Sequence, residues 1–133
     1  MSERRFVRFQ AVSPNRHGRY PGVFGLVNGL ARTGVLTGVQ ERFRRVNNDW
    51  YNGNLVDPSE VDPEVYNRAV HPGAASWFKA AAVAMIERVE GYLAILEAHS
   101  VPWVRLDSDA PGKILYEDPN QVVAVQHAGA RTP

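Results

Sequence analysis

The side chains best suited to chemistry lie in the segment 15–22, which reads Asn-Arg-His-Gly-Arg-Tyr-Pro-Gly. Arg16, His17, Arg19 and Tyr20 come immediately before a predicted helix. The free N–H groups and the dipole at a helix N-terminus favour an anion, and arginine binds carboxylate and phosphate through paired hydrogen bonds. The segment is therefore predicted to bind a phosphate or carboxylate. The alternative is a solvated turn whose arginines meet the acidic second half of the chain.

A second polar cluster comes at the end of another predicted helix. There Asn47, Asp49 and Tyr51 are interleaved with Trp50, which continues the apolar face of that helix. Polar groups beside aromatic rings suit a hydrogen-bonding pocket, and these three residues join the segment 15–22 in one predicted ligand site. The alternative is that the asparagines merely terminate the helix.

Other kinds of site find no support in the sequence. Cysteine is absent, which excludes disulfides, thiolate metal ligands and cysteine nucleophiles. The four histidines are scattered, and the HExxH, EF-hand, P-loop, GxGxxG and GxSxG motifs are missing. No metal and no cofactor is predicted. His99 is expected to close a helix, where a cation meets the negative end of the dipole.

Charge is distributed unevenly along the chain. Residues 1–45 hold nine arginines against two glutamates, whereas residues 46–133 hold six basic and twelve acidic groups. This asymmetry indicates either a surface for polyanions or two halves that attract each other. Nucleic-acid binding would use the N-terminal arginines, although lysine is scarce and no known nucleic-acid-binding signature is present. These arginines are Arg4, Arg5, Arg8, Arg16, Arg19, Arg42, Arg44 and Arg45.

Length and composition are typical of one globular domain. The chain has 133 residues, of which 44% are apolar and 22% charged. We expect a single domain over 1–127 with a frayed tail at 128–133. Without a run of 18 apolar residues or a secretory signal, the protein is predicted to be cytoplasmic. The preference for arginine over lysine is typical of a bacterium with a GC-rich genome.

The periodicity of apolar residues and the positions of proline, glycine and capping residues predict the order of the helices and strands. Two helices, with a capping box at Thr37 and Gln40, form a hairpin after an N-terminal strand and a loop. Two Asp-Pro pairs begin short helical segments. The predicted strands are 4–12, 102–107, 113–117 and 121–126, and the predicted helices are 21–33, 37–52, 58–61, 63–69 and 73–98.

The predicted helix 73–98 is alanine-rich and organises the predicted fold. One apolar stripe runs from Phe78 to Leu96, and a second includes Trp77 and Ile95. We therefore expect an α+β fold, with an antiparallel sheet of three or four strands on one side of this helix and the helical hairpin on the other. The first stripe consists of Phe78, Ala82, Met85, Val89, Tyr92 and Leu96; the second consists of Trp77, Ala81, Ala84, Arg88 and Ile95.

Together these features favour binding over catalysis. The sequence predicts a small bacterial interaction or regulatory module that binds a protein partner or self-associates, and such a surface requires an exposed apolar patch. One alternative is a small enzyme or ligand-binding protein with an anion pocket at residues 16–20. A second alternative is a nucleic-acid-binding protein, and no membrane partner is predicted.

Overall fold

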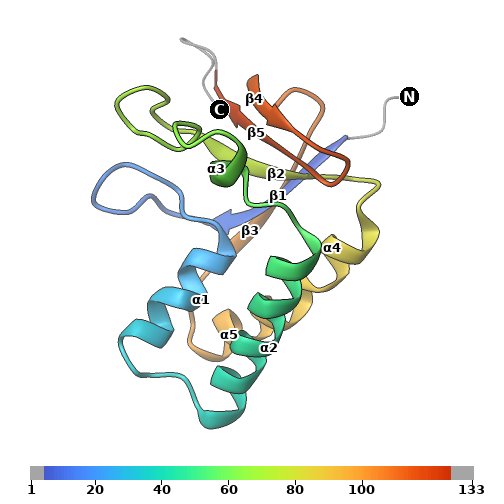
Figure 1. Ribbon diagram of the computed structural model, residues 1–133. Coiled ribbons are helices and arrows are strands. Elements are labelled where there is room, and N and C mark those ends of the chain that lie inside the picture. Colours follow the sequence, from blue (N-terminus) through green and yellow to red (C-terminus); the bar gives the residue numbers. More distant parts are fainter. Residues whose placement is uncertain (1–4, 127–133) are drawn as a thin grey trace.

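The computed structural model describes residues 5–126 and contains one five-stranded antiparallel sheet with helices packed on one of its faces (Figure 1). This confirms the predicted α+β class, with one or two strands more than expected. The elements in chain order are β1 (Phe6–Ala11), α1 (Val23–Arg32), α2 (Gly38–Asn54), α3 (Pro58–Val61), β2 (Ala75–Lys79), α4 (Val83–Glu87), α5 (Val89–Ala98), β3 (Trp103–Ser108), β4 (Lys113–Glu117) and β5 (Gln121–Val125).

The strand order is β3-β1-β2-β5-β4, so the N-terminal strand lies inside the sheet. β1 pairs with β3 along its whole length, but it pairs with β2 only at Phe6 and Val7. Beyond these residues the two strands diverge, and Gln10 forms a bridge with Gly22 instead. The gap between β1 and β2 is thus occupied by the segment that leads into α1.

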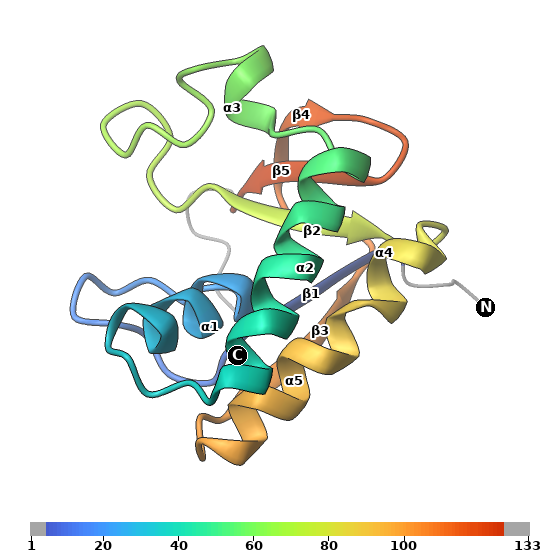
Figure 2. The same ribbon diagram turned by 60° about the horizontal axis from the view of Figure 1, so that its bottom comes forward.

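The core lies between the sheet and the three longer helices, α1, α2 and α5 (Figure 2). Val7 of β1, Val27 of α1 and Tyr92 of α5 are almost completely inaccessible to solvent. The Phe24 ring packs edge-on against Tyr92 and Tyr51, with ring centroids 4.8 and 5.0 Å apart. Because these rings come from α1, α5 and α2, their contacts hold the helices together in one cluster.

The helical hairpin was predicted correctly. The Thr37 hydroxyl accepts the Gln40 amide at 3.1 Å, and the Gln40 side chain accepts the Thr37 amide at 2.9 Å, which completes the capping box of α2. Asp57 caps the single turn of α3. The predicted helix at 63–69 is wrong: isolated turns occur there, and the Asn67 side chain accepts the Ala69 amide in competition with helical bonding.

The prediction of one long helix over 73–98 is also wrong, because β2 forms within its first third. That strand pairs with β5 from Ala75 to Phe78 and with β1 at Phe78 and Lys79, so sheet pairing replaces helical bonding there. After a turn at 80–82 the chain becomes helical as expected, and Arg88 separates α4 from α5. All six residues of the first predicted stripe are buried, whereas Ile95 alone is buried in the second.

The three C-terminal strands lie within one or two residues of their predicted bounds. The predicted tail at 128–133 falls outside the described residues. Among residues 5–126, no helix has the length and apolar character needed to cross a bilayer. His99 caps α5 as expected, and its ring nitrogen lies 2.9 Å from the side-chain oxygen of Gln40.

Candidate functional site

The predicted anion-binding segment forms an exposed loop. The Asn15 side chain accepts the amides of His17 and Arg19 at 2.9 and 3.1 Å, which closes the loop on itself. Arg16 and His17 are exposed, and their side chains contact each other, whereas Tyr20 is about half-exposed. Arg16 and His17 therefore face solvent, whereas Arg19 is partly buried.

The three predicted residues of α2 lie apart from that loop. Asn47 is buried, where it accepts a hydrogen bond from Arg88 at 2.9 Å. Tyr51 is also buried and donates to the Met85 carbonyl at 2.6 Å, whereas Asp49 is exposed. None of the seven predicted residues lines the cavity between β1 and β2 or the shallow hollow between α1 and α2. Anion binding by the exposed loop, with or without these residues of α2, stays a prediction.

A different cavity, here called the Arg8 pocket, lies where β1 and β2 diverge beside the first turn of α1. Its volume is about 340 Å³. Most of its walls are apolar or aromatic, and its polar side chains come from β1, β2, β5 and the segment after α3. The lining residues are Val7, Arg8, Phe9, Gly22, Phe24, Gly25, Leu55, Tyr66, Ala74, Ala75, Ser76, Trp77, Phe78 and Gln121.

The half-buried guanidinium of Arg8 bridges the gap between the two strands. Its Nη1 donates to the Ser76 carbonyl and its Nη2 to the Tyr20 carbonyl, both at 2.9 Å. Its Nε donates to Gln10 Oε1 at 2.8 Å. A guanidinium has five N–H donors, so one N–H remains on each Nη atom. Arg8 thus both joins the chain segments and retains donors for another acceptor.

Arg8 is the charged residue among those that line the pocket. Within residues 5–126, its guanidinium forms no ion pair with any carboxylate. Burial lowers the pKa of Arg8, because a charged group loses solvation in the interior. Arginine nevertheless remains protonated in proteins, so the pocket contains an uncompensated cation.

Two other features add polar character to the pocket. Burial raises the pKa of the Tyr66 phenol, with Ser76 and Arg8 acting in the opposite direction, so Tyr66 is neutral near pH 7. Gly22, the N-cap of α1, provides no side-chain acceptor for the first turn. Phe24 and Gly25 of that turn line the pocket, and first-turn N–H groups lack helical partners. Both the guanidinium and the helix end favour an anion.

Gln121 has a supporting role at the edge of the pocket. Its Nε2 donates to the Val56 carbonyl at 2.7 Å and to Asp118 Oδ2 at 3.0 Å. These bonds attach the segment before α3 to β5. Because its amide donors are used in this way, Gln121 shapes the wall of the pocket and leaves Arg8 as the main donor.

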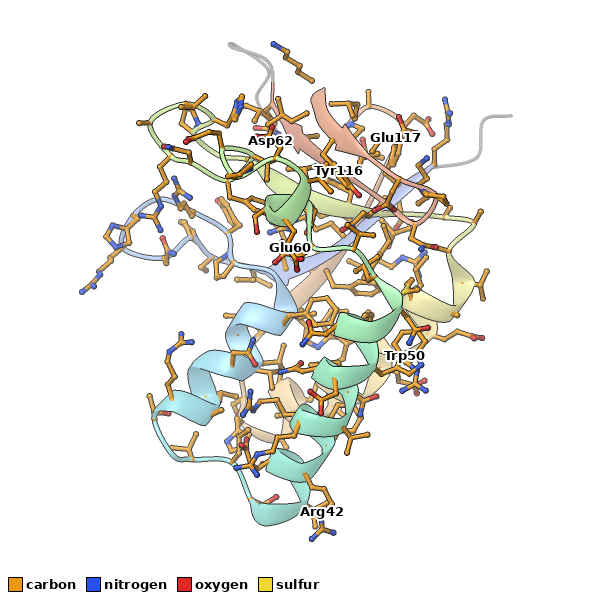
Figure 3. The ribbon with its side chains drawn as sticks, viewed as in Figure 1. Arg42, Trp50, Glu60, Asp62, Tyr116 and Glu117 are labelled. Carbon is orange, nitrogen blue, oxygen red and sulfur yellow. The ribbon has the colours of Figure 1, made fainter. Side chains whose placement is uncertain are left out.

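In the sequence, Arg8 is a candidate only for the arginine-rich nucleic-acid-binding face, not for an anion pocket. Its place in an alternating strand predicted a wet face, and the pocket exists only because β1 and β2 diverge. Among the other N-terminal arginines, Arg44 and Arg45 pair with Glu41 at 2.7 and 3.0 Å, and Arg42 points away from the body of the protein (Figure 3). Arg4 lies outside the described residues, and nucleic-acid binding stays a prediction.

Comparison of the chain with protein-family models, with curated proteins and with solved structures found no match. Among the described residues, no three histidine, aspartate or glutamate side chains are grouped so that they could hold a metal ion. The functional argument therefore depends on the chemistry of the Arg8 pocket.

Proposed function

We propose that the protein binds a small, partly apolar anion in the Arg8 pocket, with a carboxylate as the preferred charged group. One observation carries this proposal: a half-buried arginine without a carboxylate partner lines a cavity whose other walls are mainly apolar. It keeps the anion-binding alternative from the sequence but assigns it to other residues.

The physical reason is the cost of a desolvated charge. A cation removed from water is disfavoured unless an anion or several acceptors compensate it, and carbonyl dipoles compensate it only in part. A carboxylate can accept one hydrogen bond from each Nη atom of Arg8, which gives a paired and charge-assisted contact. Phe24 and Trp77 line the pocket for the apolar part of the ligand. A volume of about 340 Å³ is at the lower end for ligand sites, so the ligand is small.

The proposal can be tested with phenylacetate and its neutral analogue phenylacetamide. We expect phenylacetate to bind by isothermal titration calorimetry and to raise the unfolding temperature. A ligand at a hundred times its dissociation constant adds about 2.7 kcal/mol to the free energy of unfolding. Phenylacetamide has nearly the same shape but no charge, so it should bind at least tenfold more weakly. Equal binding of the two compounds, or of neither, would refute the proposal.

Variants then locate the site. Arg8→Met removes the charge and should abolish phenylacetate binding, whereas Arg8→Lys keeps a charge but loses the paired geometry and should bind more weakly. The matched control is Arg16→Met, which removes an exposed arginine outside the pocket. Undiminished binding by a folded Arg8→Met protein would contradict the assignment. Because Arg8 also joins two carbonyls, circular dichroism must show that each variant is folded.

A protein-partner module is the second candidate function. Val39 and Val46, seven residues apart on one face of α2, are 75% and 58% exposed, and Val35 in the preceding loop is 49% exposed. These apolar side chains support a contact surface. A partner that the wild-type protein captures should not be captured when both valines of α2 are replaced with aspartate, and this variant should keep the thermal stability of the wild type. Retained capture by that variant would exclude this surface.

A further inference from the structure

β3 forms one end of the sheet, and its outer backbone groups face no other strand of the described chain (Figure 2). It pairs with β1 through six consecutive residue pairs without irregularity. β4, at the other end, has a register shift between Ile114 and Tyr116. Bulges and irregular pairing blunt a sheet edge, whereas a regular edge can accept another strand. β3 is therefore the better of the two edges for strand addition.

The charges along β3 are complementary to themselves. Arg105 and Asp107 are alternate residues, so both lie on the same face of the sheet, and both are exposed. They form an ion pair within the strand, with Nη2 and Oδ1 3.1 Å apart. If a second β3 pairs antiparallel about a two-fold axis at Leu106, each Arg105 lies opposite an Asp107 of the other copy. Opposite charges in directly facing positions stabilise strand pairing.

This arrangement also selects one register. Moving the axis to Arg105 would place the two arginines opposite each other, and moving it to Asp107 would oppose the two aspartates. Like charges in facing positions are destabilising. At the axis on Leu106, the partly buried leucine of one copy meets the same residue of the other. A two-fold interface uses the same surface on both subunits, as this one does.

We propose that the protein forms a symmetric dimer through antiparallel pairing of β3 with β3 of a second copy, centred on Leu106. The sheet then continues from one protomer into the other. This interface is separate from the Arg8 pocket, which lies on the opposite side of β1 between β1 and β2. The dimer and the ligand site can therefore be tested independently.

The same register brings together two groups that have no hydrogen-bond partner among residues 5–126 of one chain. Oδ1 of Asp109, just beyond β3, is buried without a hydrogen bond to any described residue. Trp103 lies opposite Asp109 of the second copy in this register, and its indole N–H has no acceptor within residues 5–126. Rotation of the Asp109 side chain toward the interface gives both groups a hydrogen-bond partner.

Charge-reversal variants test the proposal by sedimentation equilibrium and light scattering. The wild type should be mainly dimeric at a protein concentration of about 100 μM, which requires a dissociation constant in the micromolar range or below. Arg105→Asp and Asp107→Arg should each be monomeric, because each places like charges opposite one another. An equimolar mixture of these two variants should form a heterodimer, and the doubly exchanged R105D/D107R protein should again dimerise.

Lys113→Glu is the matched control, since Lys113 is an exposed charged residue on the other edge strand. It should leave the dimer unchanged. A monomeric wild type, a dimeric Arg105→Asp protein or a mixture that does not associate would each overturn the proposal. Dissociation caused by Lys113→Glu alone would assign the interface to β4 instead. Circular dichroism of the doubly exchanged variant separates loss of pairing from loss of folding.

Discussion

Gly91 on α5 contacts α2 so closely that even a methyl group should be unfavourable there. A Cβ atom at this position would lie 2.1 Å from Cζ and 2.4 Å from Cε1 of Phe43. The Phe43 ring also packs edge-on against Tyr92, with centroids 5.2 Å apart. The Phe43 ring must therefore move away from α5 before alanine can occupy position 91.

Two opposing effects set the size of the change. Replacing glycine with alanine inside a helix stabilises it by about 1 kcal/mol. Overpacking costs about 1–3 kcal/mol, because the ring must leave its preferred position. We expect Gly91→Ala to lower the free energy of unfolding by about 1 kcal/mol in the wild type, the difference between these two effects. In a Phe43→Ala background the clash is gone, so the same substitution should stabilise by about 1 kcal/mol.

The assay is a double-mutant cycle by urea unfolding, followed by tryptophan fluorescence. The expected coupling energy between positions 43 and 91 is about 2 kcal/mol, within the range for residues in contact. The decisive result is the change of sign between backgrounds. If Gly91→Ala stabilises the wild type as much as it stabilises Phe43→Ala, the proposed clash does not control packing between α2 and α5.

Three further predictions concern single positions. Hydrogen bonds from Arg44 and Arg45 lower the pKa of Glu41 from 4.5 to about 2. The stability that these bonds provide is therefore full above pH 4.5 and is lost as the pH falls toward 2. In Glu41→Gln, the thermal unfolding temperature should fall less steeply with acid than in the wild type. Tyr51→Phe removes the buried donor to the Met85 carbonyl, and chemical denaturation should show a loss of about 1–2 kcal/mol. Gly112→Ala should lower the free energy of unfolding by at least about 2 kcal/mol in the same assay. The φ of Gly112 is 132°, which disfavours a side chain, and a Cβ atom there would lie 2.2 Å from the Val125 carbonyl oxygen. Unchanged stability would contradict this prediction.

The sequence predicted the local elements well because their signals are local. The capping box at Thr37, the Asp57 cap of α3 and the β-branched strands near the C-terminus each depend on neighbouring residues. The first apolar stripe also identified buried residues correctly, although Phe78 is buried from a strand. Burial can thus be predicted even where the type of element is wrong.

The errors come from contacts between distant segments. Alanine-rich sequence favours a helix at 73–79, but pairing with both β1 and β5 overrides this preference. No short-range pattern shows that Ser76 will meet Arg8, or that β1 and β2 will diverge. The Arg8 pocket was not predicted for the same reason, because its cavity is created by the topology of the sheet.

The strand order has a consequence for the sequence of events in folding. β1 is made first, yet its partners β2 and β3 follow only after the helical hairpin has been synthesised. The hairpin depends on short-range contacts and can form early, whereas the sheet must close long loops. β1 therefore lacks its one full-length partner until β3 is available. An N-terminal fragment ending before β3 should lack a stable sheet and expose the apolar side chains of β1 to aggregation.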